Sequence, residues 1–409
     1  MDDLARQRLR VYLLAICQAL FLTCAVASVS VAAIVGAELA PTPWMTTLPY
    51  GLQFAVVILC AYPVSRLMGA VGRRPAFLLG ACFAMAAGVT GYLAIRGGSF
   101  AGLILSHVLL GIFITHANYY RFAATDGVEA ALRARAVALV TAGGVLAGIL
   151  APLLTLEAGA LFEGQSFAHS YLIFSLAGVI TFLVMLGVPG LNAPATSSAK
   201  PTAERAESPA VPSSMAGVGA FLAMYCAGAG YLVMNLLMVQ STLALNTGPG
   251  SHALVGVAIQ LHVVAMFLPS FFTGRLLERF GHTRVLGVGF LLLVLSALTG
   301  MPGEAPFFVV PSLILLGVAW NFLYVGGSAF LTLCHAPERA HRVQGVNDTV
   351  VSGLAAVGAL GAGALYHLLG WSGSLVLSLP VAGVGLAMLV YWQRATAASG
   401  IRKGEAPES

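Results

Sequence analysis

Long apolar stretches alternate with short polar segments along the whole chain. An α-helix needs about 20 consecutive apolar residues to cross the hydrocarbon core of a bilayer. The polar–apolar alternation of transmembrane strands is absent. The pattern therefore predicts an all-α membrane protein with twelve transmembrane helices. The twelve stretches cover residues 11–38, 46–68, 75–95, 100–122, 134–158, 168–189, 216–245, 252–277, 284–301, 306–331, 344–369 and 372–393.

Composition agrees with this prediction. Apolar residues make up 59% of the 409 residues, charged residues 9%, and the mean hydropathy is +0.91. A soluble domain carries about 25% charged residues, so this chain has too few charges to cover a surface in water. We therefore expect neither a soluble enzyme nor a disordered protein. We do not expect nucleic acid as a partner, because the positions of the basic residues along the chain explain the net charge of +5.

The basic residues predict the orientation in the membrane. If the N-terminus is cytoplasmic, all Lys and Arg residues except Arg96 fall in cytoplasmic segments. An excess of Lys and Arg marks the cytoplasmic side of membrane proteins. We therefore expect both termini to be cytoplasmic. The first stretch is too long for a signal peptide, so we expect it to remain as a helix.

A polar segment divides the chain into two sets of six spans. Residues 190–214 are rich in Pro, Ala and Ser, which is typical of a flexible linker. We expect an N-terminal six-helix half at 1–189, a C-terminal half at 215–394 and a cytoplasmic tail at 395–409. Two related halves predict a substrate site at their interface, near the middle of the membrane.

The loops that follow the second and eighth spans resemble each other, with Gly281 lying 209 residues after Gly72. The second copy follows the pattern G-x-x-x-[DE]-R-x-G-x-x-[RK], whereas the first has Gly69 at the acidic position. This repeated loop resembles the signature of the major facilitator superfamily. The resemblance implies the major facilitator fold, with gating contacts made by Gly72, Arg73, Arg74, Gly274, Glu278, Arg279 and Gly281.

Spans seven and eight carry soft metal ligands at helical spacing. Met234 and Met238 are four residues apart, as are His262 and Met266, so each pair lies on one helix face. Thioethers and imidazole together suit Cu(I) and discriminate against Mg²⁺ or Ca²⁺. Packing is the alternative interpretation, because Met commonly fills cores. At the corresponding positions of the first half, 209 residues earlier in the sequence, no such set of ligands occurs.

These paired motifs resemble those of the CcoA-type copper importers. The resemblance implies a transporter of the bacterial inner membrane that imports copper, as cargo rather than cofactor, for cytochrome oxidase assembly. It also implies Met234, Met238, His262 and Met266 as the copper ligands, and a copper chaperone as a possible partner. The wider family includes members linked to riboflavin uptake, so riboflavin or another small organic molecule stays as the alternative cargo.

Four further polar residues lie within the predicted spans, where polar groups are expensive and often functional. Gln53 corresponds to His262 in the repeat. His116 is a better candidate than His107 for facing the cavity, but we favour a structural role in which it bonds to a neighbouring helix. Asn321, beside Trp320, could line a cavity that also suits a flat ring. Asp348 could carry a coupling proton, but we favour a helix start capped by Asp348 or its neighbour. No nucleotide-binding loop is present, which favours transport driven by a gradient.

Overall fold

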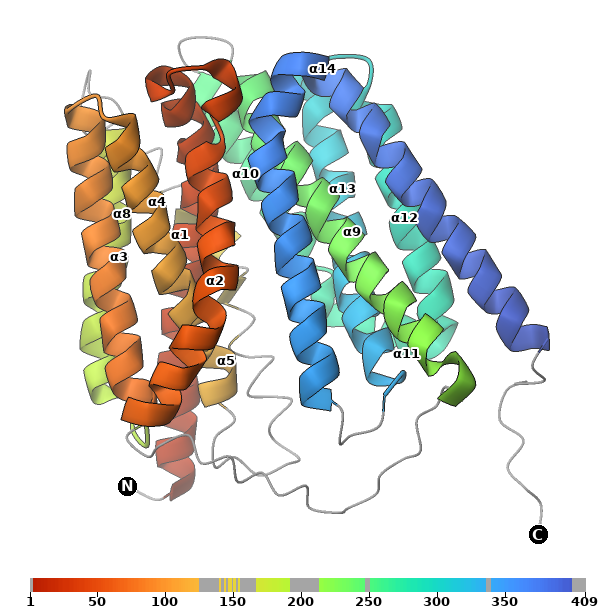
Figure 1. Ribbon diagram of the computed structural model, residues 1–409, viewed down its shortest axis with the longest axis horizontal. Coiled ribbons are helices and arrows are strands. Elements are labelled where there is room, and N and C mark those ends of the chain that lie inside the picture. The colour runs from red at the N-terminus through yellow and green to blue at the C-terminus, as the bar shows by residue number, and fades with distance from the viewer. Residues whose placement is uncertain are drawn as a thin grey trace.

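The computed structural model consists of α-helices in the residues that it describes (Figure 1). It describes residues 3–124, 167–191, 213–246, 251–335 and 340–398, together with residues 140, 143, 144, 146–148, 150, 151 and 154. No strand occurs among these residues. The long helices are α1 (Asp3–Leu39), α2 (Leu48–Val71), α3 (Arg73–Arg96), α4 (Phe100–Ala117), α8 (Ala168–Gly187), α9 (Ser213–Leu245), α10 (Ser251–Phe267), α11 (Ser270–Phe280), α12 (His282–Gly300), α13 (Pro306–Thr332) and α14 (Ala340–Ala398). Two short helices are η1 (Pro43–Met45) and α5 (Tyr120–Ala123).

Most of the predicted spans are confirmed. Within the described residues, nine helices are long and apolar enough to cross a membrane, and the bent pair α10–α11 makes a tenth. α14 contains two predicted spans, because Gly370 interrupts it with a φ of 67° and a ψ of −175°. The predicted span at 134–158 falls mainly outside the described residues.

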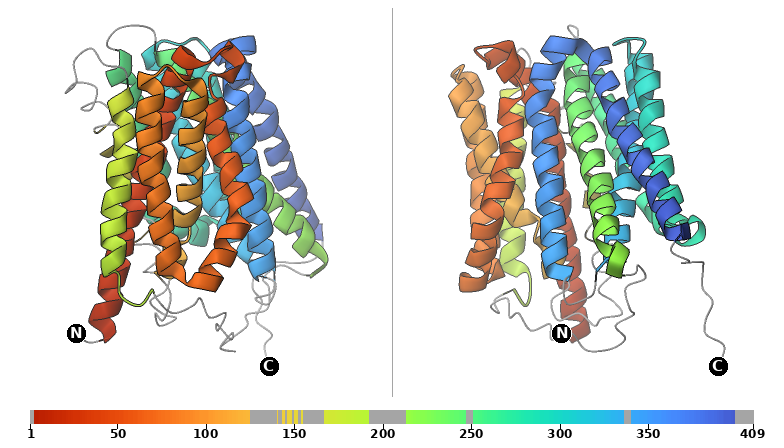
Figure 2. Two further views of the ribbon diagram at one scale, coloured as in Figure 1. Left: turned by 60° about the vertical axis from the view of Figure 1, so that its left-hand side comes forward. Right: turned by 45° about the vertical axis from the view of Figure 1, so that its right-hand side comes forward.

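The helices form two neighbouring groups. In Figures 1 and 2, α1 to α8 lie beside α9 to α14. The first residues of α1 and the last residues of α14 lie at the same end of the bundle. α8 ends at Gly187 and α9 begins at Ser213, so the predicted linker lies between the two groups in the sequence. The exact limits of the two halves, the linker and the tail stay predictions.

Small residues let the helices approach closely. Gly88 of α3 faces α8, and a Cβ at that position would lie 2.5 Å from the backbone nitrogen of Ser175. Gly178 of α8 faces α3 in return, where a Cβ would lie 2.8 Å from the backbone nitrogen of Met85. Close backbone contact at small residues is how helices associate in lipid. The α3–α8 contact therefore depends on two glycines.

We expect Gly88→Ala to destabilise the protein, because the new methyl group overlaps backbone atoms of α8. Overpacking costs about 1–3 kcal/mol. The thermal unfolding temperature of the purified protein measures the effect. The control is Gly287→Ala in α12, where no atom lies within 4 Å of the added Cβ. Equal unfolding temperatures for the two variants would contradict the close contact.

Candidate functional site

The two halves touch where α2 begins and the first part of α14 ends. The backbone N–H of Gly363 donates a hydrogen bond of 2.9 Å to the Thr47 hydroxyl. One turn further along α2, a Cβ on Gly51 would lie 2.8 Å from the Cα of Leu360. We call this end of the bundle the outer end, because the sequence predicts it to be non-cytoplasmic. The opposite end, where α1 begins, is the inner end.

A second polar contact joins the halves through the middle of α9. The Tyr50 hydroxyl donates to Oδ1 of Asn235 at 3.4 Å, and Nδ2 of Asn235 donates to the carbonyl of Tyr231 at 3.2 Å. Both Tyr50 and Asn235 are buried. Asn235 immediately follows Met234 in the predicted ligand segment. The sequence analysis did not identify this residue.

Met234 and Met238 are buried in α9, which packs against α13. Both are buried, with 5% and 4% of their surface exposed. Four residues before Met234, a Cβ on Gly230 would lie 3.2 Å from the Cβ of Leu323 in α13. Residues four apart share a helix face. Met234 is therefore expected to lie near the α9–α13 contact, and the burial of both thioethers agrees with either a packing or a ligand role.

His262 is fully buried and held by one ring nitrogen. Its Nδ1 lies 2.7 Å from the carbonyl oxygen of Leu313 in α13. A carbonyl only accepts hydrogen bonds, so Nδ1 carries the proton and Nε2 of the neutral ring carries a lone pair. Nε2 is buried and has no partner among the described residues. This nitrogen can therefore bind a metal ion or accept a hydrogen bond from a ligand.

Asn321 stabilises a break in the eighth span. α10 and α11 are bent by 41° where Pro269 separates them. Nδ2 of Asn321 donates to the carbonyl of Met266 at 2.7 Å and to the Ser270 hydroxyl at 2.6 Å, and Oδ1 accepts from the Thr273 hydroxyl at 2.7 Å. In lipid, backbone groups at a broken helix need such partners. Asn321 therefore fixes the segment that carries His262. Pro269 was the sequence signal for this break, which the sequence analysis missed.

The two helices that carry the predicted copper ligands, α9 and α10, both pack against α13. α10 contacts α13 at Gly317, where a Cβ would lie 2.7 Å from the carbonyl oxygen of His262 and 3.1 Å from the nitrogen of Met266. Among the described residues there is no group of three or more His, Cys, Asp and Glu side chains arranged to hold a metal. The copper ligand set stays a prediction.

Four aromatic side chains gather where α9, α10 and α13 meet. Trp320 and Tyr324 of α13 are stacked, with centroids 5.0 Å apart. Tyr231 of α9 contacts both rings edge-on, at 5.2 Å and 4.9 Å, and Phe267 of α10 contacts Trp320 at 5.8 Å. Nε1 of Trp320 is buried without a partner among the described residues. We call Tyr231, Phe267, Trp320 and Tyr324 the aromatic cluster.

Gln53 belongs to a polar chain within the N-terminal half. Its Oε1 lies 3.1 Å from Nδ1 of His107, whose Nε2 lies 2.9 Å from the Tyr171 hydroxyl. Nε2 of Gln53 donates to the Ser28 hydroxyl at 3.3 Å. These four buried residues join α1, α2, α4 and α8. The Gln53 side chain thus makes its hydrogen bonds within the N-terminal half. The sequence analysis did not anticipate the role of His107.

His116 lies in the contact between α4 and α3. Its Nδ1 lies 2.8 Å from the carbonyl of Ile112 in its own helix. A Cβ on Gly80 of α3 would lie 2.7 Å from the His116 Cβ, and the Phe83 ring lies 6.3 Å from the imidazole. The side chain is therefore placed between helices of the N-terminal half, and a cavity or coupling role stays a prediction.

Asp348 lies inside α14 rather than at its start. α14 begins at Ala340, so the preferred interpretation of Asn347 or Asp348 as the helix cap is wrong. Asp348 is exposed, and Nδ2 of Asn347 donates to its carboxylate at 3.4 Å. The same helix face further along carries buried Ala355 and Ala359, seven and eleven residues later. Its assignment as a coupling residue stays a prediction.

The two repeated loops have the same backbone conformation. Gly72 joins α2 to α3 with a φ of 86° and a ψ of 168°, and Gly281 joins α11 to α12 with a φ of 80° and a ψ of 154°. Each N–H donates to the carbonyl four residues earlier. Glycine adopts this positive φ without steric cost. Arg74, beside the first turn, donates to the carbonyl of Val188 where α8 ends.

We expect Gly51→Val to separate the halves at the outer end, because a branched side chain overlaps the backbone of Leu360. Overpacking of about 1–3 kcal/mol corresponds to a shift of roughly 5- to 150-fold between closed and open outer ends. Spin labels at the exposed positions Trp44 and His367, in a variant lacking the six native cysteines, report the distance between the outer ends.

The matched control is Gly69→Val at the inner end of the same helix, where no atom lies within 4 Å of the added Cβ. It should leave the distance distribution between the labels unchanged. A distribution unaffected by Gly51→Val would show that this contact does not hold the outer ends together.

Comparisons with known proteins place the chain in a family. A model of the Major Facilitator Superfamily matches residues 220–409. The riboflavin transporter RfnT of Brucella anthropi is 33% identical over 399 residues, covering 95% of this chain and 97% of that protein. The uncharacterized MFS-type transporter YdeG of Bacillus subtilis is 26% identical over 382 residues, covering 90% of this chain and 88% of that protein. The chain belongs to the major facilitator superfamily.

Solved structures share the fold. A bacterial homolog of the human lysosomal transporter Spinster, in an inward-facing and unoccupied conformation, is similar with a TM-score of 0.72 and 15% identity, over 99% of this chain and 100% of that one. The nucleoside transporter NupG is similar with a TM-score of 0.67 and 15% identity, over 94% of this chain and 98% of that one. The predicted major facilitator fold is confirmed. The protein is a multi-pass membrane transporter of this superfamily.

Proposed function

We propose that this protein transports riboflavin across the bacterial inner membrane. The observation that carries the proposal is the 33% identity to the riboflavin transporter RfnT along nearly the full length of both chains. The interpretation of the protein as a copper importer has no comparable support from the relatives named above. Riboflavin, the alternative cargo in the sequence analysis, therefore becomes the main proposal.

The aromatic cluster supports a flat, aromatic cargo. The isoalloxazine ring of riboflavin is planar and carries N–H and carbonyl groups along its edge. Stacked and edge-on aromatic contacts suit such a ring. Nε1 of Trp320 offers a donor and Nε2 of His262 an acceptor, both buried and without a partner among the described residues. A buried polar atom without a partner is costly, so a ligand that pairs with it gains affinity.

Transport would proceed by alternating access between the two halves. The contacts of Thr47 with Gly363 and of Tyr50 with Asn235 close the outer end, and their separation would admit substrate. Rocking of one half against the other around a central site is the general mechanism of such repeats. We place both termini in the cytoplasm, with an ion or voltage gradient as the energy source and Asp348 as the candidate coupling residue.

We expect Tyr324→Leu to weaken riboflavin uptake into proteoliposomes, because it removes one stacked ring from the aromatic cluster. An aromatic pair contributes about 0.5–1.5 kcal/mol, so the KM should rise roughly 2- to 12-fold. The control is Tyr391→Leu in α14, where the tyrosine is 62% exposed and distant in sequence from the cluster. A KM unchanged by Tyr324→Leu, or riboflavin uptake absent from the wild-type protein, would refute the proposal.

Copper is the second candidate cargo because of His262. Its Nδ1 is bonded to a backbone carbonyl while Nε2 stays available, an arrangement typical of metal-binding histidines. Met266 lies one helical turn away, and Met234 and Met238 are buried in α9, which packs against the same helix α13. This set would bind Cu(I) as cargo, with delivery to cytochrome oxidase assembly or to a copper chaperone.

A double variant separates the two cargoes. Met234→Leu with Met238→Leu keeps side-chain volume, and such exchanges usually cost less than about 1.5 kcal/mol. We expect riboflavin uptake within about twofold of the wild type, since no aromatic ring or hydrogen bond is removed. Radiocopper uptake is measured in the same vesicles. Wild-type copper uptake that the double variant abolishes would establish copper as the cargo instead.

A further inference from the structure

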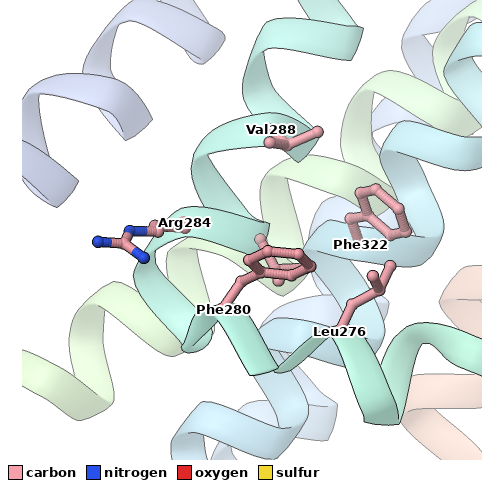
Figure 3. Close-up of a pocket in the computed structure, with 6 residues that line it drawn as sticks. Leu276, Phe280, Arg284, Val288 and Phe322 are labelled. Carbon is pink, nitrogen blue, oxygen red and sulfur yellow. The ribbon is translucent and has the colours of Figure 1, made fainter. Parts of the chain in front are cut away.

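A cavity of about 350 Å³ lies between α11, α12 and α13, at the inner end of the C-terminal half (Figure 3). Its volume falls in the range of small-ligand sites. Its wall is apolar: Arg284 contributes the aliphatic part of its side chain, and its guanidinium points away from the other lining residues (Figure 3). The lining residues are Leu276, Phe280, Arg284, Val285, Val288 and Phe322. None of them belongs to the aromatic cluster or to the predicted copper ligands.

The cavity has its own hydrophobic floor. Leu277, Val285 and Phe322 are buried and form a cluster separate from the main core. They come from α11, α12 and α13, which diverge here because α11 is turned by 41° from the line of α10. The positive φ of Gly281 then reverses the chain directly into α12. The wedge between the three helices is therefore part of the fold.

The mouth of the cavity continues into an exposed apolar stripe. Phe280 and Val288 at the mouth are each 45% exposed. Along α12, Leu291 and Leu295 follow Val288 by three and seven residues and are 57% and 47% exposed. Residues at this spacing share one helix face. In a membrane protein such a face contacts lipid chains, so the cavity opens toward the hydrocarbon of the bilayer.

Positive charge surrounds the inner end of the cavity. Arg275, Arg279 and Arg284 are exposed around it, against one exposed acid, Glu278. The guanidinium carbon of Arg279 lies 5.3 Å from the centroid of the Phe280 ring, at the mouth. Basic residues at the cytoplasmic face attract anionic lipid headgroups. An apolar slot with guanidinium groups outside its inner end matches one acyl chain attached to a phosphate.

We propose that this cavity binds an anionic phospholipid of the inner leaflet. One acyl chain occupies the slot above Leu277, Val285 and Phe322, and the phosphodiester pairs with the guanidinium of Arg284. The bound lipid fills the wedge between α11 and the two helices beside it. It thereby supports α11, whose upper end is held by Asn321 at the break in the eighth span.

The test compares lipids of one chain length added to the purified, delipidated full-length protein. Phosphatidylglycerol is the anionic probe, phosphatidylcholine the zwitterionic one, and inorganic phosphate the headgroup alone. Thermal unfolding and native mass spectrometry report binding. We expect phosphatidylglycerol to bind and stabilise more than phosphatidylcholine, and phosphate alone to have no effect. Equal effects of the two lipids, or full stabilisation by phosphate, would overturn the proposal.

Two variants localise the effect to this cavity. Arg284→Gln should weaken phosphatidylglycerol binding roughly fivefold, because it removes one cation beside the headgroup. Val288→Trp should fill the mouth and abolish stabilisation by phosphatidylglycerol. Both positions are exposed, so the variants should fold, which their elution from a sizing column checks. Transport is not measured, so the result is independent of the cargo.

The matched controls are Arg66→Gln, at the inner end of α2, and Val390→Trp, which is 46% exposed in α14. Both should leave phosphatidylglycerol binding at the wild-type level. If the controls weaken binding as much as Arg284→Gln and Val288→Trp do, the lipid binds without regard to this cavity and the proposal is wrong.

Discussion

The need to satisfy every backbone hydrogen bond inside lipid governs this structure. Helices meet the requirement within one segment, which is why nearly all of the described chain is helical. The eighth span is irregular at Pro269, because proline has no backbone N–H to donate to a helical hydrogen bond. Asn321 of α13 compensates with hydrogen bonds to the Met266 carbonyl and the Ser270 hydroxyl. A single amide thus permits an irregular backbone in the middle of the bundle.

α13 consequently forms the common wall of the candidate site. α9 approaches it at Gly230 and α10 at Gly317, so both neighbours lie close to its backbone. The stacked pair Trp320 and Tyr324 projects from the same helix. The side chain of His262 is oriented by a carbonyl of α13 as well. The candidate site in the C-terminal half is therefore built on one helix and on the small residues that let its neighbours approach it.

Buried polar groups are used in two ways, although Nε2 of His116 in the N-terminal half is also buried without a partner among the described residues. In the N-terminal half, Gln53, His107 and Tyr171 bond to one another and fasten their helices together. In the C-terminal half, His262 and Trp320 each keep a buried nitrogen without a partner among the described residues. The first arrangement favours a rigid body, and the second favours a ligand.

The sequence alone determined the span pattern, the two repeated turns at Gly72 and Gly281, and the superfamily, because hydropathy and glycine spacing are local properties. It did not determine which way His116 and Gln53 point, nor that Asp348 lies within a helix rather than at its start. Those outcomes depend on the rotation of each helix against its neighbours. In lipid an apolar helix has no hydropathic face to fix that rotation, so close packing and buried hydrogen bonds decide it in the tertiary structure.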